Sequence, residues 1–286
     1  MAAGNGPVEP RTTAAAPAAQ AAGQPVAEPA TEVLAPGQSR LLEAVLPACA
    51  HHHLALAGTP ALRAYGLPVP VRRTEELELV TGDSTPVTAI ADAVAATGRD
   101  AGCEAAPQTP GTPLLASLLL TPPYEPLARP VAVAIGKRPL AHPPVWTDAV
   151  LDRPVPLVSR EDAASLTVTA MTDRTLPEDL LAVHALSDWF SEGELLAMAG
   201  AFDEDFRAGA LAERLDKLAS LDDEAYQRCG APDERIGEVK RWALAWAQDI
   251  TLDLMEGREN PDSYYDSEDD GAADDAAEPG QEADEV

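Results

Sequence analysis

The chain has 286 residues, of which 48 are Asp or Glu and 20 are Lys or Arg, and its formal net charge is −28. A chain this acidic repels phosphate backbones, which disfavours nucleic-acid binding unless the fold gathers a local basic patch. The three cysteines are scattered without a Cys-x-x-Cys spacing, as is typical of reduced thiols in a cytosolic protein.

The two ends of the chain have compositions that predict disorder. Residues 1–38 are rich in Ala, Pro, Gly and Gln and lack periodic apolar positions. Residues 257–286 form an acidic low-complexity tail whose like charges repel one another. Between them we expect an α/β domain at 39–158 and a helical C-terminal domain at 159–256. The chain shows neither a secretory signal pattern nor an apolar run of membrane-spanning length, so we expect a cytoplasmic protein without membrane contact.

The first predicted domain alternates short apolar runs with helical patterns. This alternation indicates an α/β (α+β) fold in which helices surround a small mixed sheet. In the helix expected at 84–98, Thr85 is the predicted cap and Pro86 the predicted first residue. In chain order, the elements we expect are a helix at 39–50, a strand at 54–58, a helix at 60–66, a strand at 77–81, the helix at 84–98, and strands at 114–120 and 130–135.

The second predicted domain is helical. The sequences "TLPE" (175–178) and "SEGE" (191–194) fit the capping box that begins a helix. The two tryptophans of the last helix are interpreted as core residues, and the alternative is a stacking platform for bases. They belong to an apolar stripe with steps of three or four residues, formed by Ile236, Val239, Trp242, Trp246, Ile250 and Leu254.

The stretch "RRTEELELV" (72–80) carries the first candidate site. On a strand, Glu76 and Glu78 point to the same face, so their carboxylates stand side by side as in many metal-dependent enzymes. Three interpretations are open: a metal site, the remains of one, or the solvated face of a strand. Gly58 and Thr59 precede a helix, where backbone N–H groups can hold a phosphate; the alternative is an ordinary strand-to-helix turn.

Residues 55–81 run through a strand, a Gly-polar turn, a helix, Arg-x-Thr and a strand with an acid-x-acid pair. This order resembles the nucleotidyltransferase core of the AbiEii/AbiGii toxin family, and the resemblance covers about 40–250. The family typically shows Gly-Gly or Gly-Ser, then Ala-Leu, then Arg-x-Ser/Thr-x-Asp-apolar-Asp. The resemblance implies that nucleotide is bound by Gly58, Thr59, Arg72 and Thr74. It also implies that Glu76 and Glu78 hold the metal and carry out catalysis.

The chain departs from the family pattern at several of these positions. Both strand acids are Glu, one methylene longer than the family's Asp, and Mg²⁺ tolerates little error in its octahedron. The family's third Asp aligns with Ala134, and its lysine aligns with Thr167. Its Arg-Asp pair reads Glu178-Asp179, so Asp179 is retained, while the following Asp is Ala182.

The resemblance and these losses together predict a nucleotidyltransferase-fold protein related to toxins of toxin–antitoxin and phage-defence systems. We expect it to be catalytically reduced or inactive and kept for binding or regulation, with no cofactor or with weakly bound Mg²⁺. An antitoxin-like protein is the partner that the resemblance implies. Two alternatives stand beside this prediction. One is an active Mg²⁺-dependent enzyme that modifies RNA or protein with a site rebuilt from Glu76, Glu78 and Asp179, and the other is an acidic interaction protein that uses the fold as a scaffold.

Overall fold

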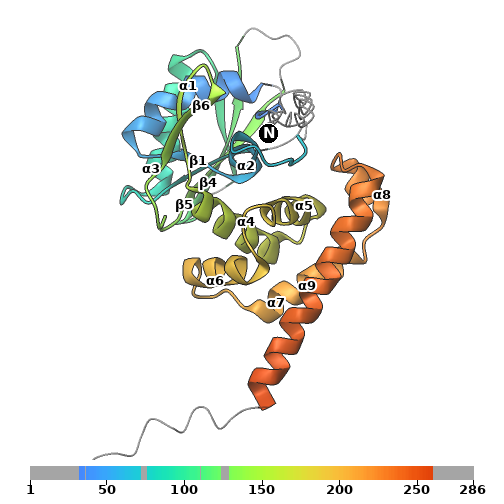
Figure 1. Ribbon diagram of the computed structural model, residues 1–286. Helices are drawn as coiled ribbons and strands as arrows, with labels where there is room; N and C mark the ends of the chain where they lie inside the picture. The colour runs from blue at the N-terminus through green and yellow to red at the C-terminus, as the bar shows by residue number, and fades with distance from the viewer. Residues whose placement is uncertain (1–31, 36, 72–75, 110, 124–128, 260–286) are drawn as a thin grey trace, which may run out of the picture. The chain divides into compact units, whose positions relative to one another are not determined.

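The computed structural model describes residues 32–35, 37–71, 76–109, 111–123 and 129–259 (Figure 1). Arg72 and Thr74 lie outside the described residues, as do most of the two predicted tails. All described residues belong to one compact unit. Within these ranges, no helix combines the length and the apolar character that crossing a membrane requires.

The described residues form helices and strands that alternate at first and are helical from residue 160 onward. In chain order the elements are α1 (Gln38–His51), β1 (Ala55–Leu56), α2 (Gly58–Ala64), β2 (Leu77–Thr81), α3 (Val87–Asp100), β3 (Glu104–Thr109), β4 (Leu115–Thr121), β5 (Val131–Lys137), β6 (Val145–Leu151), β7 (Arg153–Leu157), α4 (Arg160–Arg174), α5 (Pro177–Leu186), α6 (Glu192–Phe202), α7 (Ala208–Ala219), α8 (Asp223–Arg228) and α9 (Asp233–Glu259).

The strands form one mixed sheet in the order β3-β4-β5-β2-β1-β7-β6. Near its centre, β2 pairs antiparallel with β1 and parallel with β5, and β1 pairs parallel with β7. The strands β4 and β6 join antiparallel to their neighbours. The predicted α/β fold, a mixed sheet with helices that is followed by a helical segment, is confirmed.

The alternation of side chains along β2 serves two cores. Leu77 and Leu79 point into a cluster that contains α1, α3 and the inner residues of β5. Val80 joins the other cluster, which contains α2 and the helices from α4 to α9. Because successive side chains of a strand face opposite sides, Glu78 faces the same side as Val80, toward α4. The predicted domain division at residue 158 stays a prediction, since the second cluster also includes strand residues that precede it.

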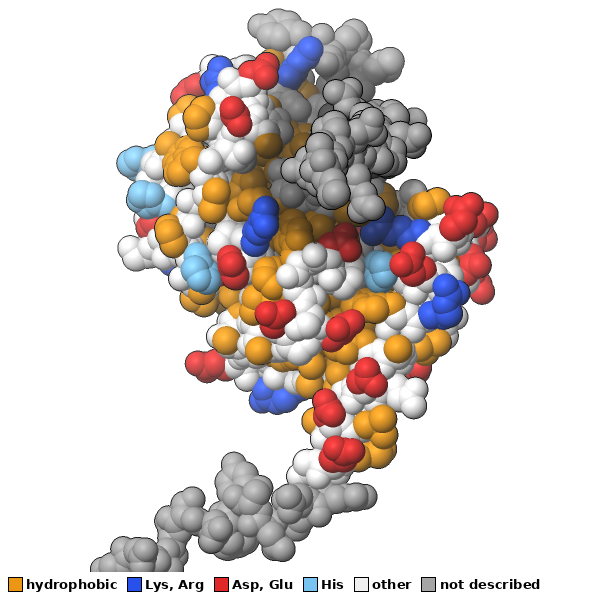
Figure 2. All heavy atoms as spheres, viewed as in Figure 1, with side chains coloured by type: hydrophobic (Ala, Val, Ile, Leu, Met, Phe, Trp, Pro, Cys, Tyr) orange, Lys and Arg blue, Asp and Glu red, His pale blue; other side chains and the backbone are white. Residues whose placement is uncertain are grey.

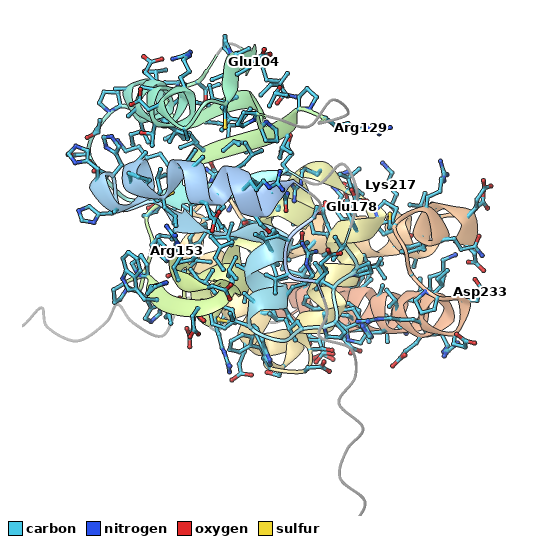
Figure 3. The ribbon with its side chains drawn as sticks, turned by 90° about the horizontal axis from the view of Figure 1, so that it is seen from above. Glu104, Arg129, Arg153, Glu178, Lys217 and Asp233 are labelled. Carbon is cyan, nitrogen blue, oxygen red and sulfur yellow. The ribbon has the colours of Figure 1, made fainter. Side chains whose placement is uncertain are left out.

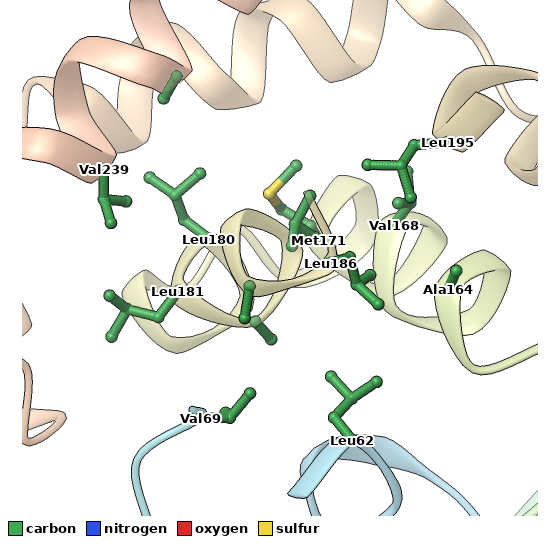
Figure 4. Close-up of a cluster of buried hydrophobic side chains, with 14 of the residues drawn as sticks. Leu62, Val69, Ala164, Val168, Met171, Leu180, Leu181, Leu186, Leu195 and Val239 are labelled. Carbon is green, nitrogen blue, oxygen red and sulfur yellow. The ribbon is translucent and has the colours of Figure 1, made fainter. Parts of the chain in front are cut away.

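The second cluster joins α2 to the helical segment (Figure 4). Val69 lies on the side of Leu181 and Leu62 on the side of Leu186, both of α5, while Leu180 points to the other side of this helix, where Met171 of α4 lies. Burying a leucine of this kind contributes about 1.5–3 kcal/mol relative to leaving it exposed. This apolar contact fixes α4 and α5 above the start of β2.

Helix starts follow the predicted capping in one case and not in the other. Ser191 and Glu194 form the predicted capping box at the start of α6. The box predicted at 175–178 is wrong, because Thr175 has a φ of 55° and ends α4 instead. Only two residues separate α4 from α5, so Thr175 serves the end of α4 and Pro177 at the first turn begins α5.

The structure corrects three sequence-based boundaries. The predicted N-terminal tail extends too far, because Leu34 and Ala35 are buried and Gln38 begins α1. The helix α9 ends at Glu259, three residues into the predicted acidic tail. The third helix begins at Val87, so its N-cap is Pro86 rather than Thr85.

The apolar stripe of α9 is confirmed from Ile236 to Ile250, although Trp242 is only partly buried. Ile236, Val239 and Ile250 are buried, and Trp246 is 3% exposed. Trp242 is only partly buried and donates a hydrogen bond from Nε1 to Oε1 of Glu192 at 2.8 Å. Leu254 is 41% exposed, and so are the other side chains of 251–257 along the last turns of α9.

Candidate functional site

A pocket of about 340 Å³ lies where the start of α2, the start of β2 and the α4–α5 turn meet. We call it the Arg174 pocket. Figure 3 labels Glu178, one of its lining residues, between the sheet and the helical segment. Its lining residues are Gly58, Thr59, Glu76, Glu78, Leu166, Thr167, Ala170, Arg174, Leu176, Glu178, Asp179 and Ala182.

The pocket brings together most of the residues that the sequence singles out. Gly58 and Thr59 come from the start of α2, Glu76 and Glu78 from the start of β2, and Asp179 from the first turn of α5. Thr167, Glu178 and Ala182, at which the sequence departs from the family that it resembles, line the same pocket. Arg72 and Thr74 lie outside the described residues. The roles of all these residues in binding or catalysis stay predictions.

The carboxylate of Glu78 lies against the turn that begins α2. Gly58 has a φ of +65°, and a Cβ atom placed on it would lie 2.7 Å from Oε2 of Glu78. Glycine is therefore required here both by the left-handed backbone and by the contact with Glu78. The unpaired N–H groups at a helix start are where a phosphate group binds. Glu78 places an anion of the protein itself beside them.

Arg174, the last residue of α4, holds two of the pocket's acids. Its Nη2 donates a hydrogen bond to Oδ1 of Asp179 at 2.8 Å, and its Nη1 lies 3.5 Å from Oε1 of Glu78. Burial lowers the pKa of Arg174, but attraction to Asp179 and then Glu78, with hydrogen bonds to both, raises it overall. The guanidinium is thus fixed as a cation between the two carboxylates.

Sequence analysis missed Arg174 as a site residue. It ends α4 in the sequence "TDRT", and no motif of the resembling family drew attention to it. In the sequence, the one indication is that Arg174 and Asp179 stand five residues apart on either side of a helix-helix turn. A cation at the end of one helix and an acid at the start of the next each suit the local helix dipole.

Asp179 is the most buried acid of the pocket. It is 5% exposed, and its Oδ2 has no hydrogen-bond partner among the described residues. Burial raises the pKa of Asp179 to about 6; the nearby Arg174 acts in the opposite direction, and Glu178 adds to the rise. The carboxyl of Asp179 therefore keeps its proton to a higher pH than an exposed aspartate does.

The neighbouring strand β5 offers no carboxylate at the position that pairs with Glu78. Ala134 of β5 is the register partner of Glu78 on β2, and it lines a second, adjoining pocket of about 430 Å³ that Glu78 also borders. The hydroxyl of Thr167 donates to the backbone oxygen of Ala163 at 2.7 Å, so this side chain is tied to its own helix.

The donor set does not fit Mg²⁺. Among the described residues, no group of three or more His, Cys, Asp and Glu residues could hold a metal ion. Glu78 and Asp179 are both paired with Arg174, and the methyl group of Ala134 offers no ligand. A divalent cation would have to compete with a guanidinium that is already in place.

The opposite wall of the pocket is partly apolar and partly acidic. Leu166 and Ala170 of α4 and Ala182 of α5 supply apolar surface. Glu178 adds a further acid, and its Oε2 accepts a weak hydrogen bond from Sγ of Cys229 at 3.4 Å. Among the described lining residues, Arg174 is the one cation beside four carboxylates.

Comparison with known proteins finds no family model that matches this chain and no curated protein that matches its sequence. Several solved structures are similar. JHP933 from Helicobacter pylori has 16% identity and a TM-score of 0.46, over 80% of this chain and 99% of that chain. The nucleotidyltransferase toxin MenT4 from Mycobacterium tuberculosis H37Rv has 18% identity and a TM-score of 0.42, over 73% and 90%. The antibiotic-resistance factor ANT(2'')-Ia has 14% identity and a TM-score of 0.39, over 58% and 90%. At these values each is a distant likeness that assigns no family, substrate or activity to this chain.

Proposed function

We propose that this chain is a nucleotidyltransferase-fold protein of the AbiEii-like type whose transfer site no longer works and is kept for binding or regulation. The order of β1, a glycine turn, α2 and an acid pair on β2, with β5 parallel beside β2, supports the fold part of this proposal. It is the arrangement that the sequence resemblance implies.

The observation that carries the loss of activity is the bridge from Arg174 to Glu78 and Asp179. Phosphoryl-type transfer depends on positioning and on neutralising phosphate charge, commonly with metal ions held by carboxylates. Here Glu78 and Asp179, two of the acids that would hold a metal, are already ion-paired with the protein's own guanidinium. Ala134 supplies no third ligand, so the site has no means of holding the ion that the chemistry needs.

Charge also disfavours a nucleoside triphosphate in the Arg174 pocket. The one cation among its described lining residues is already paired, and Glu178 stands where the family has an arginine. Glu78 places a carboxylate at the start of α2, where a phosphate would need to approach. Like charges in a concave site repel more strongly than on an open surface.

For the remaining role we propose binding in the cytoplasm to a protein partner of the antitoxin type.

One specific feature favours a second candidate function, that of an acidic interaction protein. The last turns of α9 expose Leu252 and Met255 beside Asp253 and Glu256, and Figure 2 shows acidic and apolar side chains together there. Replacing Leu252 and Met255 by Ser should abolish partner capture if this candidate is correct and leave it unchanged if the Arg174 pocket is what binds.

Calorimetry with nucleotides tests the proposed function. The full chain is titrated with ATP, GTP, CTP and UTP, each with and without Mg²⁺. We expect heats close to those of dilution, with no gain from Mg²⁺. Binding that requires Mg²⁺ and that Glu76→Ala removes would show a working metal–nucleotide site and would contradict the proposal.

A further inference from the structure

We propose that the second half of α9 binds a cationic amphipathic helix of a partner protein. The inference rests on the proposed function, because it names the partner class of its second candidate, the acidic interaction protein. The docking surface consists of Leu244, Leu252 and Met255, which are 46%, 48% and 55% exposed. We call these three residues the outer stripe.

The outer stripe is a second apolar face on a helix that already buries one. Residues three, four, seven or eight apart lie on the same face of a helix, so the steps of eight and three between Leu244, Leu252 and Met255 keep these side chains together. Val239 and Ile250, which are buried, belong to the face that packs against α5 and α7. The outer stripe stays exposed, and apolar side chains that gather on a surface in this way mark protein interaction sites.

The helix α9 extends beyond the helices that support it. Figure 1 shows α9 running past α7, and all side chains of 251–257 are exposed. Leu254 lies on a different side from the outer stripe, toward the start of α7, where a Cβ atom placed on Gly209 would lie 3.5 Å from its Cδ1. Helical turns that lack tertiary packing are marginally stable in water. A partner helix along the outer stripe supplies the packing that these turns lack.

Acids flank the outer stripe and set the sign of the partner's charge. Asp249, Asp253 and Glu256 are exposed and follow one another at helical steps of four and three. After Arg241, the helix holds these three acids and no Lys or Arg up to residue 257, and the adjoining segment 203–207 holds three acids and one Arg. The helix dipole adds partial negative charge at the C-terminal end of α9, so this surface attracts a cationic partner and repels a second copy of the chain.

Charges outside the described residues do not reverse this sign. Residues 258–286, which follow the outer stripe, hold 12 Asp or Glu and one Arg, and residues 1–31 hold two Glu and one Arg. Arg72 and Arg73 follow Pro68, whose backbone oxygen accepts a hydrogen bond of 2.8 Å from the first turn of α9. At 1.5 Å per residue, that turn lies about 30 Å from the last residue of the outer stripe.

A helix with leucines at helical spacing and Lys or Arg on one flank matches this surface. Its leucines bury the side chains of Leu252 and Met255, and the unbranched thioether of Met255 adapts to different apolar surfaces. Its cations lie opposite Asp249 and Asp253, and the methylene stems of Lys and Arg cover apolar surface at the same time. The pairing joins apolar burial, which gives affinity, to charge complementarity, which selects the partner.

The test is a fluorescence titration of the full-length protein against a labelled synthetic peptide that carries Leu at helical spacing and Lys elsewhere. A scrambled peptide of the same composition keeps the charge and loses the apolar face. We expect the amphipathic peptide to bind at least about tenfold more tightly than the scrambled one. Leu252→Gln with Met255→Gln should remove this preference, and Gln keeps the helix propensity of α9. Val145→Gln with Trp146→Gln removes two exposed apolar side chains from β6 and should leave the preference unchanged.

A matched pair of charge variants tests the acidic flank. Asp249→Asn with Asp253→Asn should weaken the binding of the amphipathic peptide several-fold at low salt and lessen its dependence on salt. Asp92→Asn with Asp100→Asn removes the same charge from exposed positions on α3 and should weaken binding less. An equal loss in the two pairs would show attraction to the whole acidic chain and would overturn the cationic part of the inference.

Equal binding of the two peptides by the unaltered chain would overturn the inference, as would a preference that the variant at 252 and 255 keeps. Sedimentation of the full chain tests the other occupant, because self-association that this variant abolishes would assign the outer stripe to a second copy instead. The nucleotide titrations keep these outcomes apart from the proposed function. If the peptide preference is absent and Mg²⁺–nucleotides do not bind, only this inference fails. If Mg²⁺–nucleotide binds through Glu76, the proposed loss of nucleotide transfer is what fails.

Discussion

Glu78 on β2 and Ala134 on β5 are register partners across two parallel strands. A carboxylate at 134 would stand beside Glu78 on the sheet surface that faces the Arg174 pocket, and the second pocket borders both positions. Alanine puts a methyl group there instead. The two strands therefore bring position 134 beside Glu78, and this chain has no acid there.

Restoring short acids at the three strand positions should create metal affinity. The triple variant Glu76→Asp, Glu78→Asp and Ala134→Asp places three aspartates within reach of one ion, and shorter side chains hold Mg²⁺ or Mn²⁺ more rigidly. We expect Mn²⁺ affinity to rise by on the order of tenfold or more in calorimetry. As a control, Ala149→Asp on the exposed strand β6 adds a charge far from any predicted site. An equal gain in that control would show a general charge effect.

Arg174→Met should destabilise the fold, because it leaves Glu78 and Asp179 without their shared cation. Losing one partner of a buried pair costs about 3–5 kcal/mol, but the Arg174 side chain is 45% exposed and water screens part of the effect. We therefore expect a loss of about 1–3 kcal/mol in urea unfolding. Lys217→Met, at an exposed position on α7, serves as the control and should change stability little. No difference between the two variants would mean that the Arg174 bridge contributes nothing.

Asp179 should make stability depend on pH between about 4 and 6. Its folded pKa, raised by burial to about 6, lies above the ordinary value of 3.8, so the folded state binds the proton more tightly than the unfolded state. Above pH 6 the charged form therefore destabilises the fold, by on the order of 3 kcal/mol. This cost declines as the pH falls from 6 to 4.

The comparison of unaltered protein with Asp179→Asn isolates this effect. Unfolding free energies measured at pH 4, 5, 6 and 7 should show that the variant gains stability relative to the unaltered chain as the pH rises. Asp216→Asn, whose acid is exposed, should run parallel to the unaltered chain. A constant difference for Asp179→Asn across this range would contradict a raised pKa.

The two tryptophans of α9 should differ in their contribution to stability. Trp246 is 3% exposed within the core, and Trp246→Ala should cost about 3–5 kcal/mol. Trp242 is partly buried and bonded to Glu192, so Trp242→Ala should cost less. Leu244→Ala, at a position 46% exposed on the same helix, is the control and should be nearly neutral. Equal costs at 242 and 246 would contradict the burial difference.

The central elements of the fold could be predicted because local signals agree with the tertiary structure there. The strand expected at 77–81 has the same bounds as β2. It could be predicted because its apolar residues supply both faces of the strand, each of which packs in a core. The strands β3, β6 and β7 were missed. Pro107 lies within β3, and Pro154 and Pro156 lie within β7. Proline normally argues against a strand because it cannot donate to the ladder.

The candidate site could be predicted only as far as family motifs reach. The order of motifs along the chain placed Gly58, Glu78 and Asp179 together, and the structure brings them into one pocket. It did not reveal Arg174, because an ion pair between the end of one helix and the start of the next depends on how α4 and α5 turn. That turn rests on Thr175 in a left-handed conformation, which a predicted capping box at the same residue obscured.

The loss of nucleotide transfer is tested most directly by a labelling assay. The unaltered chain is incubated with each labelled nucleoside triphosphate, Mg²⁺ or Mn²⁺, total RNA and a protein mixture, beside Glu76→Ala. The bridge of Arg174 to Glu78 and Asp179 and the alanine at 134 predict that no label reaches RNA or protein in either sample. Label that the unaltered chain transfers and Glu76→Ala does not would contradict this account and show an active enzyme with a two-glutamate site.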